Sequence, residues 1–177
     1  MTRLRLATLL MLAVSVSIGA VDSAYNRGVE AYQAKKYDEA FRHWTEAASH
    51  GSVDALNNLG YLLFSGRGVT KNQEEATDLW RTAAYAGHSE AKWHLGAAYE
   101  HGTGVNKDRA RAYAWYRCAV ASSQWKLKQA DSETERHIMK DTDESLRKLT
   151  AELSKQDLAR GEVLAAECIQ RYGKPAL

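Results

Sequence analysis

The chain has 177 residues, of which 45% are hydrophobic and 26% are charged, and its net charge at pH 7 is +2. This composition is that of a folded globular protein, so it excludes a disordered or fibrous chain and a strongly basic nucleic-acid binder. One proline and 12 glycines argue against many short strands and turns, which favours helices.

The N-terminus has the order of charged, apolar and small residues that is typical of a secretory signal peptide. Arg3 and Arg5 precede the apolar run Leu6–Ile18, and Ala20 is small enough to stand before a cleavage point. The run is too short to span a bilayer comfortably. We therefore expect residues 1–20 to be a signal peptide and the mature chain to be periplasmic, without a stable membrane span. The alternative is a retained N-terminal anchor.

The mature chain repeats itself at an offset of 36 residues. Small, apolar and glycine residues recur in one register over most of a repeat, which is hard to obtain by chance. The matched residues are Ala55, Leu59, Gly60, Gly66, Gly68, Val69, Lys71 and Ala76 in one copy and Ala91, Leu95, Gly96, Gly102, Gly104, Val105, Lys107 and Ala112 in the next. A period in the mid-thirties predicts a stacked array of helix pairs.

Glycines define the turn inside each predicted helix pair. Gly66-Arg67-Gly68 and Gly102-Thr103-Gly104 are expected to end the first helix, because glycine accepts the positive φ that such turns need. Gly60 and Gly96 fall inside the first helices, where glycine costs about 1 kcal/mol against alanine. We expect the close approach of a neighbouring backbone to compensate for this cost.

The second helices are predicted at about 73–86 and 108–122. Their inward faces combine large rings with alanines, which allows tight interdigitation. These faces are Ala76, Leu79, Trp80, Ala83 and Ala84 in one copy and Ala112, Trp115, Tyr116, Ala119 and Val120 in the other.

The tail departs from the repeat. Residues 124–142 are charged and lack the glycine turn, which leaves a polar helix and a connector as alternatives. A further helix is predicted to start at Ser154, with the serine as its cap, and to stop at Gly173-Lys174-Pro175. An open repeat array needs its last apolar face covered. We expect residues 124–177 to do this as a charged connector and capping helix; the alternative is a partner-binding tail.

The glycine turn and the residues around it resemble a Sel1-like repeat. Residues 53–88 and 89–123 are similar to two copies, with Ser123 where the family usually has glycine, and residues 21–52 look more like a tetratricopeptide unit. The resemblance implies an all-α fold: a short right-handed α-solenoid of about three helix-turn-helix repeats with a C-terminal capping helical segment. It also implies a protein-binding role in the bacterial envelope and no enzymatic activity.

Cys118 and Cys168 are the only cysteines, and an oxidising compartment would allow one disulfide between them. Cys118 falls at a repeat position that could face the capping helix carrying Cys168. The alternative is a pair of reduced, buried cysteines. Two cysteines so far apart, without a histidine pair at ligand spacing, predict no metal site, and no motif predicts a cofactor.

Three Ser-x-x-Lys pairs raise the alternative of a serine nucleophile acting on cell-wall or β-lactam substrates. These are Ser89/Lys92, Ser123/Lys126 and Ser145/Lys148. The companion Ser-Asp-Asn, Lys-Thr-Gly and Gly-x-Ser-x-Gly motifs are absent from the sequence, so we predict no catalytic residue. His88 is expected to be structural, since it is a usual residue at its repeat position, and His94 with His101 is a weak metal signal.

Binding is the better use of a stacked array, which curves and offers a concave face. Partners of such arrays usually contact the first helix of each pair, and exposed tyrosine and tryptophan are common anchors. The predicted protein-binding residues are Tyr25, Tyr32, Asn57, Tyr61, Trp93, Ala97 and Glu100. The alternative for these rings is packing between repeats.

The sequence therefore predicts a non-enzymatic, periplasmic protein-binding module whose partner is another protein. The resemblance supplies a narrower hypothesis, because some secreted Sel1-like proteins are immunity proteins that neutralise type VI secretion phospholipase toxins. The alternative is a general envelope assembly scaffold or regulator.

Overall fold

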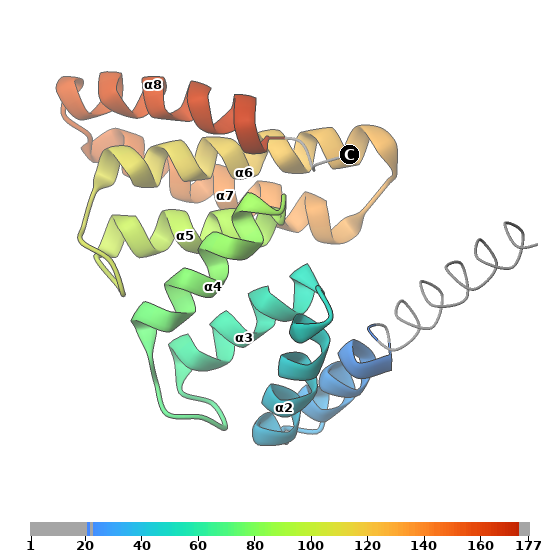
Figure 1. Ribbon diagram of the computed structural model, residues 1–177. Helices are drawn as coiled ribbons and strands as arrows, with labels where there is room; N and C mark the ends of the chain where they lie inside the picture. The colour runs from blue at the N-terminus through green and yellow to red at the C-terminus, as the bar shows by residue number, and fades with distance from the viewer. Residues whose placement is uncertain (1–20, 22, 174–177) are drawn as a thin grey trace, which may run out of the picture. The chain divides into compact units, whose positions relative to one another are not determined.

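The computed structural model describes Val21 and residues 23–173 (Figure 1). The predicted signal peptide, residues 1–20, lies outside this range. The described residues form helices joined by short turns and contain no strand. They fall into two compact units, one ending at Lys71 and the other starting at Asn72. The fold class is all-α, as predicted, and none of the described helices is long and apolar enough to cross a membrane.

The first unit contains a helix at residues 23–33, α2 (Tyr37–Ser49) and α3 (Val53–Ser65). The ring of Trp44 on α2 lies where a β-carbon on Gly28 would be, so glycine is needed at that position. The indole Nε1 of Trp44 also donates a hydrogen bond to the carbonyl oxygen of Tyr25 at 3.3 Å. Ring and glycine together set the spacing of this first helix pair.

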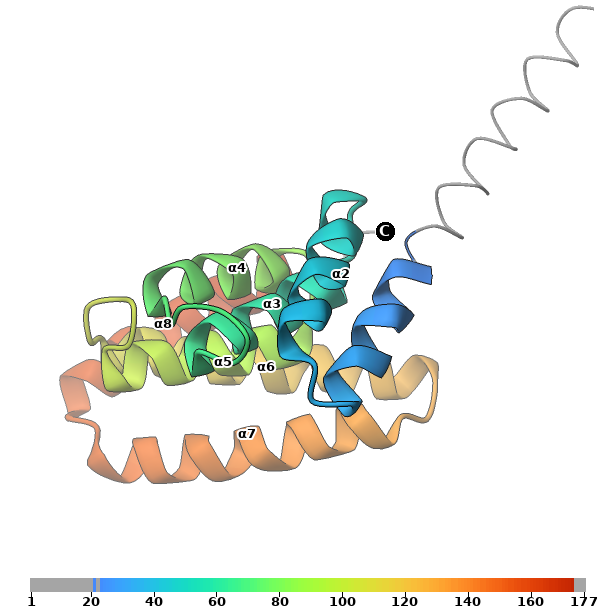
Figure 2. The ribbon, with the colours of Figure 1, turned by 90° about the horizontal axis from the view of Figure 1, so that it is seen from below.

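The second unit contains five helices. They are α4 (Gln73–Tyr85), α5 (Ser89–His101), α6 (Arg109–Gln129), α7 (Glu133–Glu152) and α8 (Lys155–Tyr172). The long helix α6 is central, because α5, α7 and α8 all pack against it. Figure 2 shows α7 running alongside α6, and α7 also contacts α5.

The local sequence signals for helix ends are confirmed. The turn glycines Gly66 and Gly102 follow α3 and α5 with φ of 70° and 75°, in the left-handed region that favours glycine. The oxygen of Ser154 accepts a hydrogen bond from the Asp157 backbone N–H, so this serine caps α8 as predicted. The predicted rings Trp80 and Tyr116 are buried.

One packing prediction is corrected by the structure. We expected a neighbouring backbone to lie against the helix-interior glycine Gly96. A β-carbon at Gly96 would instead meet the Tyr116 ring of α6 at 2.6 Å. The neighbour is therefore an aromatic side chain, which repeats the arrangement of Trp44 over Gly28 in the first unit.

The tail forms two helices that both lie on α6. The charged segment 124–142 consists of the last turns of α6 and the first half of α7, separated by residues 130–132. This resolves the earlier alternative in favour of helix. The apolar face of the tail contributes to the core beside Tyr113 and Tyr116. Its residues there are Leu146, Leu149, Leu153, Leu158, Leu164 and Ala165.

The ring-on-glycine contact predicts the effect of Gly96→Ala. Alanine in a helix interior normally stabilises by about 1 kcal/mol. Here we expect a loss of about 1–3 kcal/mol in the free energy of unfolding, because the added methyl group clashes with the Tyr116 ring. Urea denaturation measures this. Combining the change with Tyr116→Leu should shrink the loss, and a Gly96→Ala protein as stable as the wild type would contradict the assignment.

Candidate functional site

In the first unit, the structure places the predicted binding residues among polar and aromatic neighbours. Tyr32 and Tyr61 meet edge to face with ring centroids 6.3 Å apart, and Arg67 donates a hydrogen bond to the Tyr32 hydroxyl at 3.2 Å. The Tyr25 hydroxyl accepts a bond from the Asn58 amide at 3.5 Å. Asn57 is only 3% exposed, so its side chain is part of the interior.

In the second unit, neighbouring helices contact the predicted binding residues of α5. The indole Nε1 of Trp93 donates a hydrogen bond to Ser145 Oγ on α7 at 3.2 Å, and Ala97 packs against the core. Glu100 accepts a bond from the Tyr116 hydroxyl at 2.7 Å. These three residues are thus used within the chain, and a partner-binding role for them stays a prediction.

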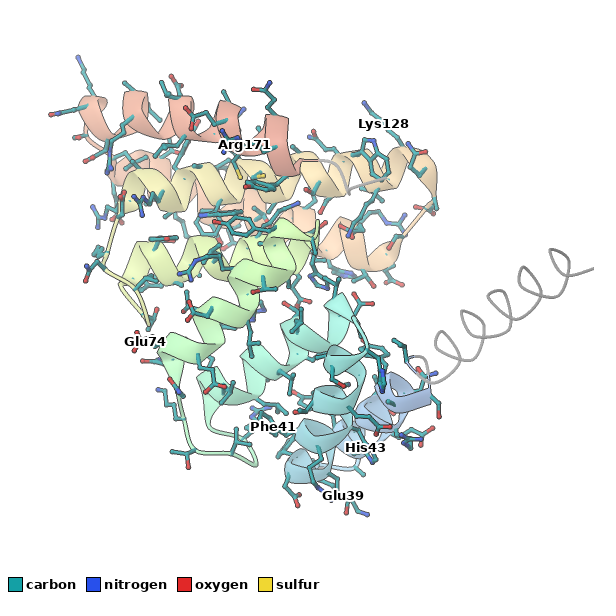
Figure 3. The ribbon with its side chains drawn as sticks, viewed as in Figure 1. Glu39, Phe41, His43, Glu74, Lys128 and Arg171 are labelled. Carbon is teal, nitrogen blue, oxygen red and sulfur yellow. The ribbon has the colours of Figure 1, made fainter. Side chains whose placement is uncertain are left out.

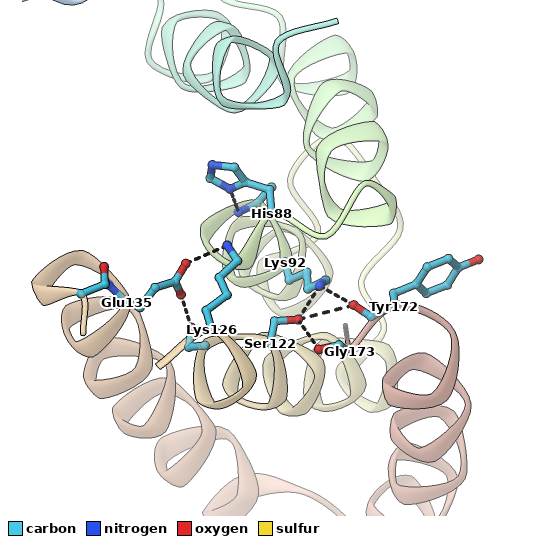
Figure 4. Close-up of polar contacts among 10 residues, drawn as sticks. His88, Lys92, Ser122, Lys126, Glu135, Tyr172 and Gly173 are labelled. Carbon is cyan, nitrogen blue, oxygen red and sulfur yellow. Dashed lines mark hydrogen bonds and ion pairs between the residues drawn. The ribbon is translucent and has the colours of Figure 1, made fainter. Parts of the chain in front are cut away.

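A buried lysine organises the polar interior of the second unit (Figure 4). Lys92 on α5 is 0% exposed. Its ammonium group donates hydrogen bonds of 2.5 Å to Ser122 Oγ on α6 and to the Tyr172 carbonyl oxygen at the end of α8. Ser122 in turn donates to the carbonyl oxygen of Gly173 at 3.2 Å. Burial lowers the pKa of Lys92 from 10.5 to about 8.

A second polar group joins α6 to α7. Glu135 accepts hydrogen bonds of 2.7 Å from both Ser123 and Lys126. Burial acts to raise the pKa of Glu135, but these bonds outweigh it, and the pKa is lowered. The carboxylate is therefore held in its charged form.

The Ser-x-x-Lys pairs do not assemble as nucleophile and base. Each lysine instead bonds a different residue: Lys92 bonds Ser122, Lys126 bonds Glu135, and Lys148 bonds Glu144 at 2.6 Å. Ser89 and Ser123 are both 0% exposed, so a substrate has no path to either hydroxyl in this structure, and Ser145 accepts a hydrogen bond from Trp93. The geometry favours a structural role for these residues.

His88 and His94 have structural partners. His88 caps α5, since its Nδ1 accepts a hydrogen bond from the Ala91 backbone N–H at 3.2 Å. The His94 ring stacks on Trp80 with centroids 4.4 Å apart, and burial lowers the pKa of His94 to about 3. Among the described residues, no cluster of three or more histidine, cysteine or acidic side chains could hold a metal ion.

Cys118 on α6 faces Cys168 on α8, as the repeat position suggested, and both are free thiols in the structure. A hydrogen bond from Cys168 lowers the pKa of Cys118, and the charge of Lys92 acts in the same direction. The same hydrogen bond, together with burial, raises the pKa of Cys168. The disulfide between them stays a prediction.

Sequence reasoning missed a cavity of about 290 Å³ between α4, α5, α6 and α8, which we call the aromatic pocket. The ring centroids of Tyr85 and Tyr172 are 4.7 Å apart, and those of Tyr85 and Trp115 are 5.8 Å apart. Tyr85 is 48% exposed, so an aromatic ring is open to solvent at the pocket. The rings and charged side chains that line the pocket are those of Tyr85, Tyr99, Arg111, Trp115, Glu167, Arg171 and Tyr172.

Two arginines line the aromatic pocket together with Glu167. Arg111 lies 5.7 Å above the Tyr99 ring, and it pairs with Asp108 at 3.4 Å. Arg171, labelled in Figure 3, lines the pocket from the last turn of α8. The sequence signal was present but ambiguous: Arg111 and Trp115 lie one helical turn apart, yet the same spacing suits a packed core.

The buried ammonium of Lys92 predicts a pH dependence of stability. Between pH 8 and 10.5 the unfolded chain keeps a proton that the folded protein releases, so the free energy of unfolding rises with pH. The full shift corresponds to about 3 kcal/mol. We expect Lys92→Met to remove this contribution and to be at least as stable as the wild type at pH 7.

The measurement is urea denaturation at several pH values, read as the difference between wild type and variant so that other titrations cancel. Lys148→Met is the matched control, because Lys148 is exposed on α7 and pairs with Glu144. In this control, the free energy of unfolding should change with pH as it does in the wild type. If the free energy of unfolding of Lys92→Met also changes with pH as in the wild type, Lys92 is not the titrating group.

Comparison with known proteins assigns the repeats. The family model described as Sel1 repeat matches residues 19–52, 53–88 and 89–123. The first match covers the segment that we compared with a tetratricopeptide unit. Among curated proteins, none matches the chain closely.

Two solved structures are similar over most of the chain. A Sel1 repeat protein from Oxalobacter formigenes is 30% identical with a TM-score of 0.54, and the match covers 75% of this chain and 97% of that protein. A protective antigen of uropathogenic Escherichia coli strains, described as having an SLR fold, is 26% identical with a TM-score of 0.67. That match covers 86% of this chain, which spans only 30% of the antigen. The chain belongs to the Sel1 repeat family.

Proposed function

We propose that this protein is a non-enzymatic module that binds another protein in the periplasm, and that the aromatic pocket is its principal contact. Sel1 repeats are generally protein–protein interaction modules, which supports the binding role. The signal-peptide pattern of residues 1–20 supports the compartment.

The observation that carries the proposal is the composition of the aromatic pocket. Tyrosine, tryptophan and arginine are the residue types that dominate binding energy at protein interfaces. Here four rings and two arginines from four helices line one open cavity. A rigid aromatic wall loses little conformational entropy on binding, and an arginine fork can pair with a carboxylate of the partner.

Two forms of this function differ in the number of partners. The narrower is an immunity protein that neutralises a type VI secretion phospholipase, which requires one tight, stoichiometric complex. The broader is an envelope assembly scaffold or regulator, which contacts several proteins. A hydrolase acting on cell-wall or β-lactam substrates is a weaker candidate, because Ser89 and Ser123, two of the three serines in the Ser-x-x-Lys pairs, are enclosed.

The test is affinity capture of the C-terminally tagged full chain from periplasmic extract, followed by mass spectrometry and titration of each purified partner. Tyr85→Ala/Arg171→Ala alters the aromatic pocket, and Val163→Ala, 62% exposed on α8, is the control. Tyr61→Ala/Trp93→Ala tests the binding row that the sequence predicts. We expect the pocket variant to weaken a partner at least about tenfold, whereas the control should not.

The outcomes separate the possibilities. A single phospholipase partner at one-to-one stoichiometry would support the immunity role, and several envelope proteins would support a scaffold. If only the binding-row variant weakens the complex, the pocket assignment is wrong and the sequence-predicted face is the site. A chain that retains no protein partner would contradict the proposed function.

A further inference from the structure

The two cysteines differ in their access to solvent. Cys118 is 0% exposed within α6, whereas Cys168 is half-buried and lines the aromatic pocket. They lie on α6 and α8, which pack against each other, each thiol shifts the pKa of the other, and they carry no bridge. A reagent that enters through the pocket therefore reaches the sulfur of Cys168 first.

The enclosed thiol has a cation as its neighbour. The ammonium of Lys92 is buried by α5, α6 and the end of α8, and its charge favours the thiolate of Cys118. Thiolate, not thiol, is the nucleophile in exchange reactions. Cys118 is thus suited to attack a disulfide that has formed on Cys168.

We propose that Cys118 and Cys168 are a reactive dithiol, which a disulfide oxidant entering the aromatic pocket converts to an intramolecular bridge, with Cys168 reacting first and Cys118 closing. The structure supplies the order, because one sulfur is open to the pocket and its partner lies enclosed behind it. The oxidant is any disulfide R–S–S–R small enough, or extended enough, to reach into the pocket.

The chemistry balances as two exchange steps. Cys118, the more acidic of the two thiols, ionises and takes up the proton of Cys168 as the Cys168 sulfur attacks one sulfur of R–S–S–R; the S–S bond breaks, and the expelled RS⁻ takes up a proton. Cys118 then loses its proton and attacks the Cys168 sulfur of the mixed disulfide, expelling the second RS⁻, which is also protonated. The protein loses two electrons and two protons, and R–S–S–R is reduced to two R–SH.

Oxidised glutathione is the probe that tests this order. The purified, reduced full chain and its Cys118→Ser and Cys168→Ser variants are incubated with it, quenched with acid and analysed by intact mass. The wild type should form the Cys118–Cys168 disulfide without accumulating a mixed disulfide with glutathione. Cys118→Ser should hold one glutathionyl group on Cys168, and Cys168→Ser should acquire one at least about tenfold more slowly, because Cys118 is enclosed.

A measurement on the unaltered chain guards against misfolded variants. Reduced wild type is treated with less than one equivalent of iodoacetamide and digested, and labelling should fall predominantly on the peptide that contains Cys168. Preferential labelling of Cys118, equal labelling of both cysteines, or a wild type that stays reduced or retains glutathione in excess oxidised glutathione would overturn the proposal.

Discussion

The close pairing of helices in this protein depends on an aromatic ring that fills the place of a missing β-carbon. Trp44 over Gly28 and Tyr116 over Gly96 are two instances, one in each unit. The ring brings the partner helix into contact, and no other residue than glycine leaves room for it. In the second unit this contact seats α6 on α5. Helices α7 and α8 then pack on α6, so the polar interior and the aromatic pocket both depend on it.

The buried and half-buried charges of the second unit are compensated in different ways. Lys126 bonds the carboxylate of Glu135, whose pKa is lowered. Lys92 donates its hydrogen bonds to neutral oxygens, and burial lowers its pKa. The lysine therefore orients α5, α6 and α8 through directed hydrogen bonds, at an electrostatic cost that a hydrophobic residue would not have.

The sequence was sufficient for features that depend on neighbours along the chain. The offset of 36 residues located the helix pairs, because burial of one helix face imposes its period on the residues. Helix ends could be located from single residues. Gly66 and Gly102 adopt the left-handed backbone conformation after α3 and α5, and Ser154 caps the first turn of α8. These signals need no knowledge of what packs against the helix.

The features that the sequence could not supply depend on contacts between distant segments. The repeat predicts that equivalent positions on the first helices are equally open to a partner. In the structure α7 lies on α5, and Ser145 of α7 accepts a hydrogen bond from Trp93. Lys92 was visible only as part of a Ser-x-x-Lys pair, although its partners lie on α6 and α8. The aromatic pocket combines rings from four helices, and each ring alone resembles a core residue.

The bond from Lys92 to the Tyr172 carbonyl joins residues 80 positions apart, and this separation has a consequence for the order of folding. Contacts between α5 and α6 are close in sequence and can form as soon as both segments are synthesised. Helix α8 is made last among the described helices. Until it docks, the end of α8 does not cover the Lys92 ammonium, which can remain hydrated. Desolvation of the lysine then coincides with the closing step of folding, after the helices around it have assembled.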